Sequence, residues 1–528
     1  MAEFDPVTLE VLRNALEAAA QEMGAVLKKT AFSPNIKERM DASCAIFDAQ
    51  AQLVAQAEHV PVHLGAMMQA VAPTLAHTGP LAPGDVVLVN DPFVAGAHLP
   101  DVTVLAPVHL GEQLLGYVAT RAHHSDIGGM EPGSMPGHSR EIYQEGLVVP
   151  PVRLYRGGEL QQDLLALVLA NVRTPRERRG DLDAQIAAVR VGARRVLELA
   201  HKYGSAVLVD GFAAILDYAE RRMRRMLALL PDGDYLGEDC LDDDGSSDEA
   251  IRVCVRATVA GEQLTIDFAG SAGMRPGNIN AVAPMTASAT FFAVKLLTDP
   301  SLPVNAGTFR PVRIEIPAGS FLNAQHPAAV CAGNTETTQR VADTVLRAFA
   351  ELAPARIPAA SQGTMNLVSV GGVDPRNGQR YTYIETIGGG QGGRPRGPGE
   401  SGIQCHMTNT MNTPIESLEI SYPLRVERYE LRTGSGGAGL HAGGEGLVRT
   451  LRVIDHEARV SFSSDRRRHA PYGLRGGASG APGRNLIAPL QGPARVQASK
   501  TSVSVAAGEA VVVETPGGGG WGAPPGTA

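Results

Sequence analysis

Apolar residues at helical spacing dominate the first thirty positions of the chain. Asp5 is suited to cap a helix that begins at Pro6, and apolar side chains then recur every three or four residues from Leu9 to Val26. A shorter segment with the same period runs from Leu64 to Leu75. The pattern therefore predicts one long and one shorter helix in the N-terminal part.

The middle of the chain is predicted to be helical as well. From Leu160 to Leu230 the apolar period is again that of a helix. Asp181 is the predicted cap of one helix, and a second helix is predicted from about Ala206 to Leu229.

Beyond residue 234 the pattern changes to short alternating strands. These strands, Tyr235 to Phe268, precede helices at about Met285 to Leu297 and Thr337 to Leu352. After Pro423 the chain reads as strands separated by glycine turns. The fold expected is mixed α/β (α+β) with several subdomains, and a chain of 528 residues is too long for a single core. The predicted regions are an N-terminal α/β region (1–158), a helical region (159–234), a second α/β region (235–425) and a β-rich C-terminal region (426–528).

A predicted hairpin brings several possible metal ligands to one place. Asp101 to Leu110 and Gln113 to Ala122 are extended apolar runs, joined by Gly111-Glu112, which suits a two-residue turn. This turn places Asp101 opposite Ala122, one residue from His123, and a bulge at Pro107 would shift the register by one residue. His98 precedes Asp101 by three residues in a loop that Pro100 makes tight.

Imidazole and carboxylate side chains at one end of a hairpin are the ligands that a divalent metal requires. Histidines near strand ends also often bond only to the backbone, and loop carboxylates often cap or stay solvated. The spacing alone leaves a metal site and a structural role equally open.

Composition excludes several classes of protein. A net charge of -8 gives no electrostatic reason to expect nucleic acid or an acidic membrane as a partner. The N-terminus lacks the apolar core of a signal peptide, and no segment has the length of apolar residues that a membrane span requires. Five scattered cysteines without a C-x-x-C pair favour reduced thiols and a cytoplasmic protein.

Glycine-rich stretches at Ile387 to Gly402 and Gly434 to Gly446 need an interpretation. Neither contains the phosphate-binding motif G-x-x-x-x-G-K-[ST], and the first lacks a strand-turn-helix context for dinucleotide binding. Turns and close backbone packing are the favoured explanation. The long loop from Gly128 to Gly146 directly follows His123 to Asp126, which favours a functional lid.

Several segments occur in order along the chain and end with TPGGGGWG; they include DPVTLEVLRNAL, ERMDASCAIFD, EHVPVHLGAM, NDPFVAGAHLPDVTVLAPV, HHSDIGG, IGGGQGG and HMTNTMNTPIESLEISYPLRVERYELR. Through these segments the chain resembles the hydantoinase B/oxoprolinase family over essentially its whole length. The resemblance implies a beta subunit that acts with a larger hydantoinase A-type subunit, which carries the ATP site, on a small cyclic amide. It also implies that Asp41, His98, Asp101 and His123 bind a divalent metal such as zinc, iron or manganese.

The expected function is therefore that of the metal-binding subunit of an ATP-dependent cyclic-amide hydrolase, in a hetero-oligomer. A subunit of an ATP-dependent ketone carboxylase is an alternative within the same family, and a scaffold without catalytic function is a third reading. His124 and Asp126, which follow a predicted ligand, are candidate catalytic proton carriers, although ordinary capping of the loop explains them as well. His59 and His63 are candidates for orienting Asp41.

Overall fold

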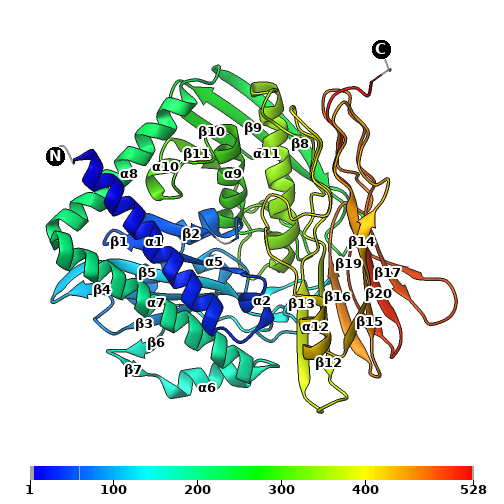
Figure 1. Ribbon diagram of the computed structural model, residues 1–528, viewed down its shortest axis with the longest axis horizontal. Helices are drawn as coiled ribbons and strands as arrows, with labels where there is room; N and C mark the ends of the chain where they lie inside the picture. The colour runs from blue at the N-terminus through cyan, green and yellow to red at the C-terminus, as the bar shows by residue number, and fades with distance from the viewer. Residues whose placement is uncertain (1–4, 59, 526–528) are drawn as a thin grey trace.

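The computed structural model describes residues 5–58 and 60–525, and the mixed α/β fold class that the sequence predicts is confirmed in it. The strands form four sheets, and long helices cover one face of the first of them (Figure 1). His59, one of the histidines singled out in the sequence, lies outside the described residues.

The first helix forms where its cap and its apolar stripe predict it. Helix α1 (Pro6–Thr30) starts with Pro6, and the Asp5 carboxylate accepts a hydrogen bond from the backbone N–H of Thr8 at 2.9 Å. Its buried face contains Leu12, Leu16 and Met23, each fully shielded from solvent. This face packs on the first sheet and on helix α7 (Pro175–Tyr203).

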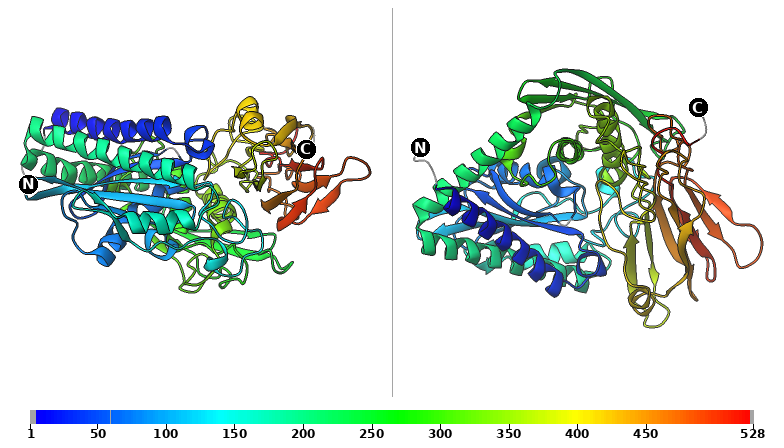
Figure 2. Two further views of the ribbon diagram at one scale, coloured as in Figure 1. Left: turned by 90° about the horizontal axis from the view of Figure 1, so that it is seen from below. Right: turned by 45° about the horizontal axis from the view of Figure 1, so that its top comes forward.

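The first sheet contains seven strands in the order β2-β1-β5-β4-β3-β6-β7. The bounds are β1 (Ala42–Asp48), β2 (Leu53–Glu58), β3 (Val86–Val89), β4 (Asp101–Leu110), β5 (Gln113–His123), β6 (Val152–Arg156) and β7 (Glu159–Leu160). Helices α1 and α7 lie in a layer over one face of this sheet, as the view from below shows clearly (Figure 2). The short helix α2 (Pro34–Lys37) precedes β1, and the short helices α3 (His63–Met68), α4 (Val71–Thr78) and α5 (Pro92–Ala95) connect later strands.

The β4–β5 hairpin has the predicted turn and a register that the predicted bulge changes. Leu110 pairs with Gln113, as the turn at Gly111 requires. The register shifts between Val108 and His109, one residue beyond Pro107, so that Asp101 pairs with His123 instead of Ala122. The shift brings two of the predicted metal ligands directly opposite each other.

The helical middle comprises α6 (Gln162–Ala170), α7 and α8 (Ser205–Leu227). One detail of the prediction is wrong: Asp181 lies inside α7, which begins six residues earlier at Pro175. Its carboxylate accepts hydrogen bonds from the backbone N–H groups of Phe32 (2.9 Å) and Ser33 (3.0 Å) instead. Asp181 therefore joins α7 to the segment between α1 and α2.

The second sheet has the order β11-β10-β9-β8. Its strands are β8 (Gly233–Leu241), β9 (Ile251–Ala260), β10 (Gln263–Asp267) and β11 (Val312–Glu315), and the helices of this region are α9 (Ala283–Leu297), α10 (Ala306–Phe309) and α11 (Thr338–Leu352). Helix α11 packs against β8 and β9, and helix α8 contacts β10. A π-helical segment, Gly333–Thr337, leads directly into α11. Such segments are often associated with functional sites.

Two further sheets complete the molecule, in the orders β13-β12-β16-β19 and β14-β15-β20-β17-β18. Their bounds are β12 (Leu367–Val373), β13 (Arg380–Glu385), β14 (Leu424–Arg432), β15 (Gly446–Val453), β16 (Ala458–Ser463), β17 (Arg484–Ala488), β18 (Arg495–Gln497), β19 (Lys500–Val505) and β20 (Ala510–Glu514), and the short helix α12 (Ile415–Ser421) precedes β14. Strands before and after residue 425 thus share one sheet, and the predicted border at 425/426 falls inside β14. The division into four regions stays a prediction.

No helix among the described residues is long and apolar enough to cross a bilayer.

Candidate metal centre

Three side chains that could hold a metal meet at the end of the β4–β5 hairpin. His98 lies in the loop after α5, Asp101 begins β4 and His123 ends β5. One nitrogen or carboxylate oxygen from each lies within 4.8 Å of the others, and all three side chains are buried. The register of β4 and β5 places Asp101 opposite His123, while the tight turn from His98 to Asp101 returns His98 to the same end, where the Asp101 N–H donates to the His98 carbonyl at 3.0 Å.

Two atoms in this group are buried without a hydrogen-bond partner. His98 Nε2 and Asp101 Oδ1 face each other in a long ion-pair contact of 3.5 Å, and neither atom forms a hydrogen bond. Leaving such atoms unpaired in the interior costs about 1–3 kcal/mol each. A cation bound between them would satisfy both, so the donor set fits a divalent metal.

The electrostatics of the three residues agree with a cation site. Burial alone would raise the pKa of Asp101, but His98 and His63 together hold the pKa of this carboxyl well below its ordinary value. The pKa of His98 is raised because the Asp101 carboxylate outweighs the opposing effect of burial. Burial lowers the pKa of His123 to about 4, which keeps this imidazole neutral and able to donate a lone pair.

Asp41, the fourth predicted ligand, lines the same cavity but is not part of the close group of three. Its carbonyl oxygen accepts a hydrogen bond from the His123 N–H at 3.0 Å. The side-chain amide of Asn35 lies 3.4 Å from Asp41 Oδ2 and 3.2 Å from His123 Nδ1. Asn35 therefore connects the Asp41 carboxylate with the His123 ring.

His63 contacts Asp101, whereas the sequence suggested a role beside Asp41. Its Nε2 lies 3.5 Å from Asp101 Oδ2, and its Nδ1 lies 3.0 Å from the hydroxyl of Ser43 on β1. The amide of Asn334 donates to the same Asp101 oxygen at 3.1 Å. Asp101 is thereby held from two sides by groups on distant segments.

The group opens on a small cavity of about 30 Å³, which has room for an ion or for one or two water molecules. Residues from β13, from the loop after it and from the π-helical segment close the cavity over the hairpin end. Its polar wall consists of Asn35, Arg39, Asn334, Thr335, Thr386, Thr408 and Thr410. The site therefore lies between the first sheet and the segments around β13 (Figure 1).

His124 and Asp126, the predicted catalytic residues, do not line this cavity. His124 is the residue after His123 and points to the opposite face, where its Nε2 lies 2.9 Å from Gln185 Oε1 on α7. The Asp126 carboxylate accepts hydrogen bonds from the backbone N–H groups of Gly128 and Arg173, both at 3.0 Å, and pairs with the Arg173 guanidinium at 2.9 Å. These contacts anchor the loop that follows, and the catalytic role of both residues stays a prediction.

Two supporting groups hold two of the three clustered side chains and were not predicted from the sequence: the Asn334 amide and the Cys331 carbonyl. His98 Nδ1 lies 3.0 Å from the carbonyl oxygen of Cys331. Both contacts join positions more than 230 residues apart. Without a local pattern at positions 331–334, single-sequence reasoning had no means of finding them.

Comparison with known proteins now places the chain. The model of the family described as hydantoinase B/oxoprolinase matches residues 5–524. The chain belongs to the hydantoinase B/oxoprolinase family. The site described above is thus the buried His/Asp group of a family member.

Two named relatives differ in how much of their length this chain covers. The chain is 38% identical to 5-oxoprolinase 1 of Arabidopsis thaliana over 98% of its own length, but it spans only 42% of that protein. It is 32% identical to the beta subunit of caprolactamase from Pseudomonas jessenii, over 99% of this chain and 92% of that one. Family members therefore occur both as a separate subunit and as part of a longer polypeptide.

Solved structures have the same fold. The crystal structure of the ATP-dependent caprolactamase from Pseudomonas jessenii superimposes with a TM-score of 0.92 at 31% identity, covering 98% of this chain and 91% of that chain. A nucleotide-free structure of acetone carboxylase gives a TM-score of 0.88 at 18% identity, covering 98% and 76% respectively. The second likeness is one of fold alone.

Proposed function

We propose that this chain is the metal-binding subunit of an ATP-dependent enzyme that opens cyclic amides such as hydantoins, 5-oxoproline or lactams. The observation that carries the proposal is the pair of unpartnered buried atoms, His98 Nε2 and Asp101 Oδ1, beside His123 in a chain of this family. A purely structural role would leave both atoms with only the 3.5 Å contact between them and no hydrogen bond. A cation would not.

In this proposal His98, Asp101 and His123 hold the metal, and Asp41 completes the set from the cavity wall. Zinc, iron and manganese all suit two imidazoles and two carboxylates. When bound, a divalent metal supplies a Lewis acid that polarises a carbonyl oxygen and lowers the pKa of water.

The residues of the chain orient this set and shield it. The Cys331 carbonyl favours the form of His98 that carries its proton on Nδ1, which leaves the Nε2 lone pair directed toward Asp101. Asn334 and His63 fix the Asp101 carboxylate. Threonine hydroxyls on the cavity wall offer hydrogen bonds to the one or two water molecules that the cavity can hold, while the surrounding core limits further access of water.

The contacts of His124 and Asp126 favour positioning over proton transfer. Both residues follow His123, and their partners tie the end of β5 to α7 and to Arg173. Their expected effect on the reaction acts through the orientation of His123.

ATP and its subunit form the second half of the proposal. An amide is resonance-stabilised and reacts slowly with water, so activation by ATP makes its ring opening feasible. The chain contains no G-x-x-x-x-G-K-[ST] motif, and the longer relatives carry more than half of their length outside the part that it matches. We therefore assign ATP binding to a hydantoinase A-type partner subunit in a hetero-oligomer.

A ketone carboxylase subunit and a scaffold without catalytic function are the competing proposals. The likeness to acetone carboxylase, at 18% identity, is one of fold alone. The relatives named 5-oxoprolinase and caprolactamase, at 38% and 32% identity, favour cyclic-amide hydrolysis. The scaffold reading offers no explanation for the unpartnered atoms at the hairpin end.

The decisive experiment uses the chain reconstituted with its ATP-binding partner. Asp101→Ala and His123→Ala should lose bound metal, measured by elemental analysis, and lower ATP-dependent ring opening of 5-oxoproline, hydantoin or caprolactam by at least about a hundredfold. The exposed Asp163→Ala and His77→Ala are the matched controls and should retain both metal and turnover. Full turnover in the Asp101 and His123 variants would support the scaffold reading, and fixation of bicarbonate into acetone would support the carboxylase.

A further inference from the structure

The loop from Gly128 to Gly146 runs beside the segment that supports the metal centre. The Ile142 N–H donates to the Pro327 carbonyl at 3.0 Å, and Glu141 forms an isolated antiparallel bridge with Ala328. The loop is largely buried, so it is a packed structural element with an exposed outer edge. Its last acidic residue, Glu145, makes the most specific contact with the neighbouring segment.

Glu145 is a fully buried carboxylate that accepts hydrogen bonds from two consecutive backbone N–H groups. Its Oε1 and Oε2 accept from the Val330 N–H at 3.1 and 3.0 Å, and Oε1 also accepts from the Cys331 N–H at 3.1 Å. The Ser139 hydroxyl donates to Oε1 at 2.8 Å. A carboxylate suits this position because every partner is a donor: Oε1 contacts all three, and Oε2 shares the Val330 N–H.

The backbone segment that Glu145 binds also orients the side chains of the proposed metal site. The carbonyl of Cys331 faces His98 Nδ1, and three residues later Asn334 donates to Asp101. Between them the chain enters the π-helical segment Gly333–Thr337. The position of the Val330–Cys331 backbone therefore decides whether the His98 ring and the Asp101 carboxylate face each other.

We propose that Glu145 is a positioning residue that fixes the geometry of the His98–Asp101 pair through the Val330–Cys331 backbone. The inference rests on the proposed metal site and extends it to a residue that does not touch the cavity. Glu145 and His98 contact the same residue: the Glu145 carboxylate accepts from the N–H of Cys331, and the carbonyl of Cys331 faces His98 Nδ1. This arrangement makes the loop after β5 a structural support of the site.

Substitution by glutamine gives the sharpest test because it keeps the shape of the side chain. In Glu145→Gln one oxygen becomes an NH₂ donor, which would face the donor N–H of Val330 and push the Val330–Cys331 backbone away. The partners of a ligand typically contribute 10- to 100-fold to metal affinity, so the affinity for Co²⁺ should fall by about that factor. The visible absorption of bound Co²⁺ should also change, because the ligand geometry around it changes.

The controls separate this effect from general destabilisation. Glu112→Gln makes the same exchange at an exposed position in the β4–β5 turn and should leave Co²⁺ affinity and absorption unchanged. Ser139→Ala removes only one of the three donors to Glu145 and should give a smaller loss of affinity, which keeps the test valid where Glu145→Gln folds poorly. Melting temperatures without metal report on folding in each variant.

The possible outcomes distinguish the inference from the proposed function. Equal Co²⁺ affinity and equal absorption in Glu145→Gln and the unaltered protein would overturn the inference and leave the metal site intact. An unaltered protein that binds no Co²⁺ would overturn the proposed metal site. In that case the crystal structure of Glu145→Gln still decides the role of Glu145, because a retained contact of 3.0 Å between His98 Nδ1 and the Cys331 carbonyl would refute it.

Discussion

Glu336 is a fully buried carboxyl in the π-helical segment that follows Cys331. Burial raises its pKa from an ordinary 4.5 to about 7. In the unfolded chain the pKa returns to its ordinary value. The folded protein therefore keeps a proton on Glu336 over a range of pH in which the unfolded chain has already lost it.

The sign of the resulting pH dependence follows directly. Below pH 4.5 Glu336 is protonated in both the folded and the unfolded state and does not change the free energy of unfolding. Between pH 4.5 and about 7 the free energy of unfolding falls as pH rises, and above pH 7 it stays at the lower level. At 1.36 kcal/mol per pH unit the loss amounts to about 3 kcal/mol.

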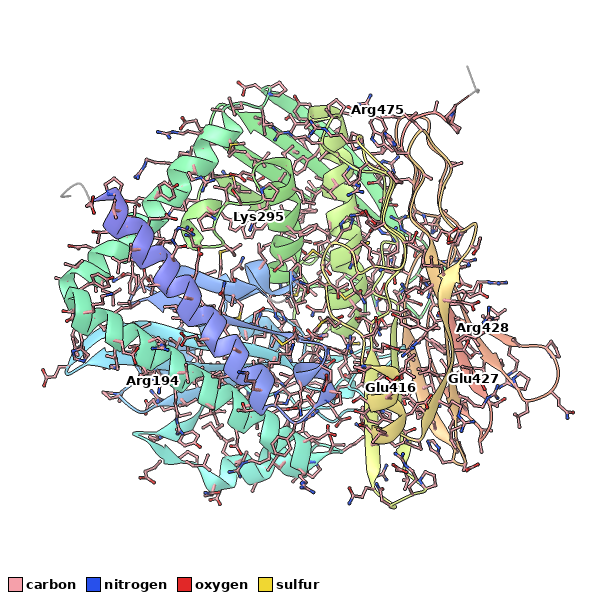
Figure 3. The ribbon with its side chains drawn as sticks, viewed as in Figure 1. Arg194, Lys295, Glu416, Glu427, Arg428 and Arg475 are labelled. Atoms are coloured by element: carbon pink, nitrogen blue, oxygen red, sulfur yellow. The ribbon has the colours of Figure 1, made fainter. Side chains whose placement is uncertain are left out.

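Glu336→Gln should remove this dependence. The melting temperature of the variant, compared with that of the unaltered protein, should rise from pH 5 to pH 8. Glu416→Gln, at an exposed position on α12 that Figure 3 labels, is the control and should show a constant difference. A pH-independent difference for Glu336→Gln as well would contradict the assigned pKa.

The clustered residues of the candidate site could be predicted from the sequence, whereas the groups that support them could not. His98, Asp101 and His123 fall within 26 positions of one another, and the turn at Gly111 and the bulge near Pro107 are local features that relate them. The supporting groups at positions 145, 331 and 334 depend on contacts across about 185–233 residues. Such contacts leave no periodic signal in a single sequence, so the support of the site became visible only in the folded chain.

At the scale of elements, the glycine-rich segments are the least ordinary feature of the C-terminal part. Residues 387–393, 434–446 and 516–522 pack backbone against backbone near the C-terminal end of the chain (Figure 1). Gly518 donates its N–H to the Gly444 carbonyl at 2.9 Å, and a Cβ on Gly518 would lie 2.1 Å from the Gln391 carbonyl oxygen. Close packing, the favoured explanation for these runs, agrees with this arrangement.

Gly518→Ala should therefore be strongly destabilising. The clash is with backbone atoms, which cannot move aside as a side chain can, and overpacking typically costs about 1–3 kcal/mol or more. Gly397→Ala is the control, because its nearest neighbour to a new Cβ is the end of the Arg394 side chain at 3.9 Å. The melting temperature should decrease clearly for Gly518→Ala only. Equal melting temperatures of the two variants would contradict the packing described.

Elements with a strong local pattern were predicted best. Helix α1 has its cap, its first proline and its apolar stripe at the predicted positions. The helix predicted from Leu64 to Leu75 is broken into α3 and α4 at Gln69 and Ala70, and α7 begins before the predicted cap. In α7 the carboxylate of Asp181 resembles a cap in the sequence but serves a tertiary contact, which local pattern cannot distinguish.

At the scale of the whole molecule, Arg39 joins the two parts between which the site lies. Its buried guanidinium donates to Asn35 Oδ1 (2.8 Å), to the Ile384 carbonyl (2.7 Å) and to Thr386 Oγ1 (2.8 Å). Asn35 belongs to α2, whereas Ile384 and Thr386 belong to β13 and the residue after it. The Met411 N–H also donates to the Arg39 carbonyl at 3.3 Å, so the loop over the cavity is held by the same residue.

Arg39→Lys should loosen this junction without removing the positive charge. A lysine ammonium cannot span acceptors on two segments as a planar guanidinium does, and hydrogen bonds from charged donors contribute about 1.5–3 kcal/mol each. The melting temperature should fall, and hydrogen exchange of the backbone should rise at 380–386 and 405–413. Arg194→Lys, on the exposed surface of α7 (Figure 3), makes the same exchange and should change neither.

The effect should also reach the proposed metal site, because Arg39 holds the oxygen of the Asn35 amide. With Arg39 in place the Asn35 carbonyl is occupied, and its amide is left to face Asp41 and His123. In Arg39→Lys the Asn35 oxygen loses this partner, and the amide is then held chiefly by its hydrogen bond to the His123 carbonyl at 2.8 Å; an amide that turned would place an oxygen against the Asp41 carboxylate. Metal affinity should therefore fall together with protection of the loop; a loop that loosens while affinity stays unchanged would mean that Asn35 holds its place without Arg39.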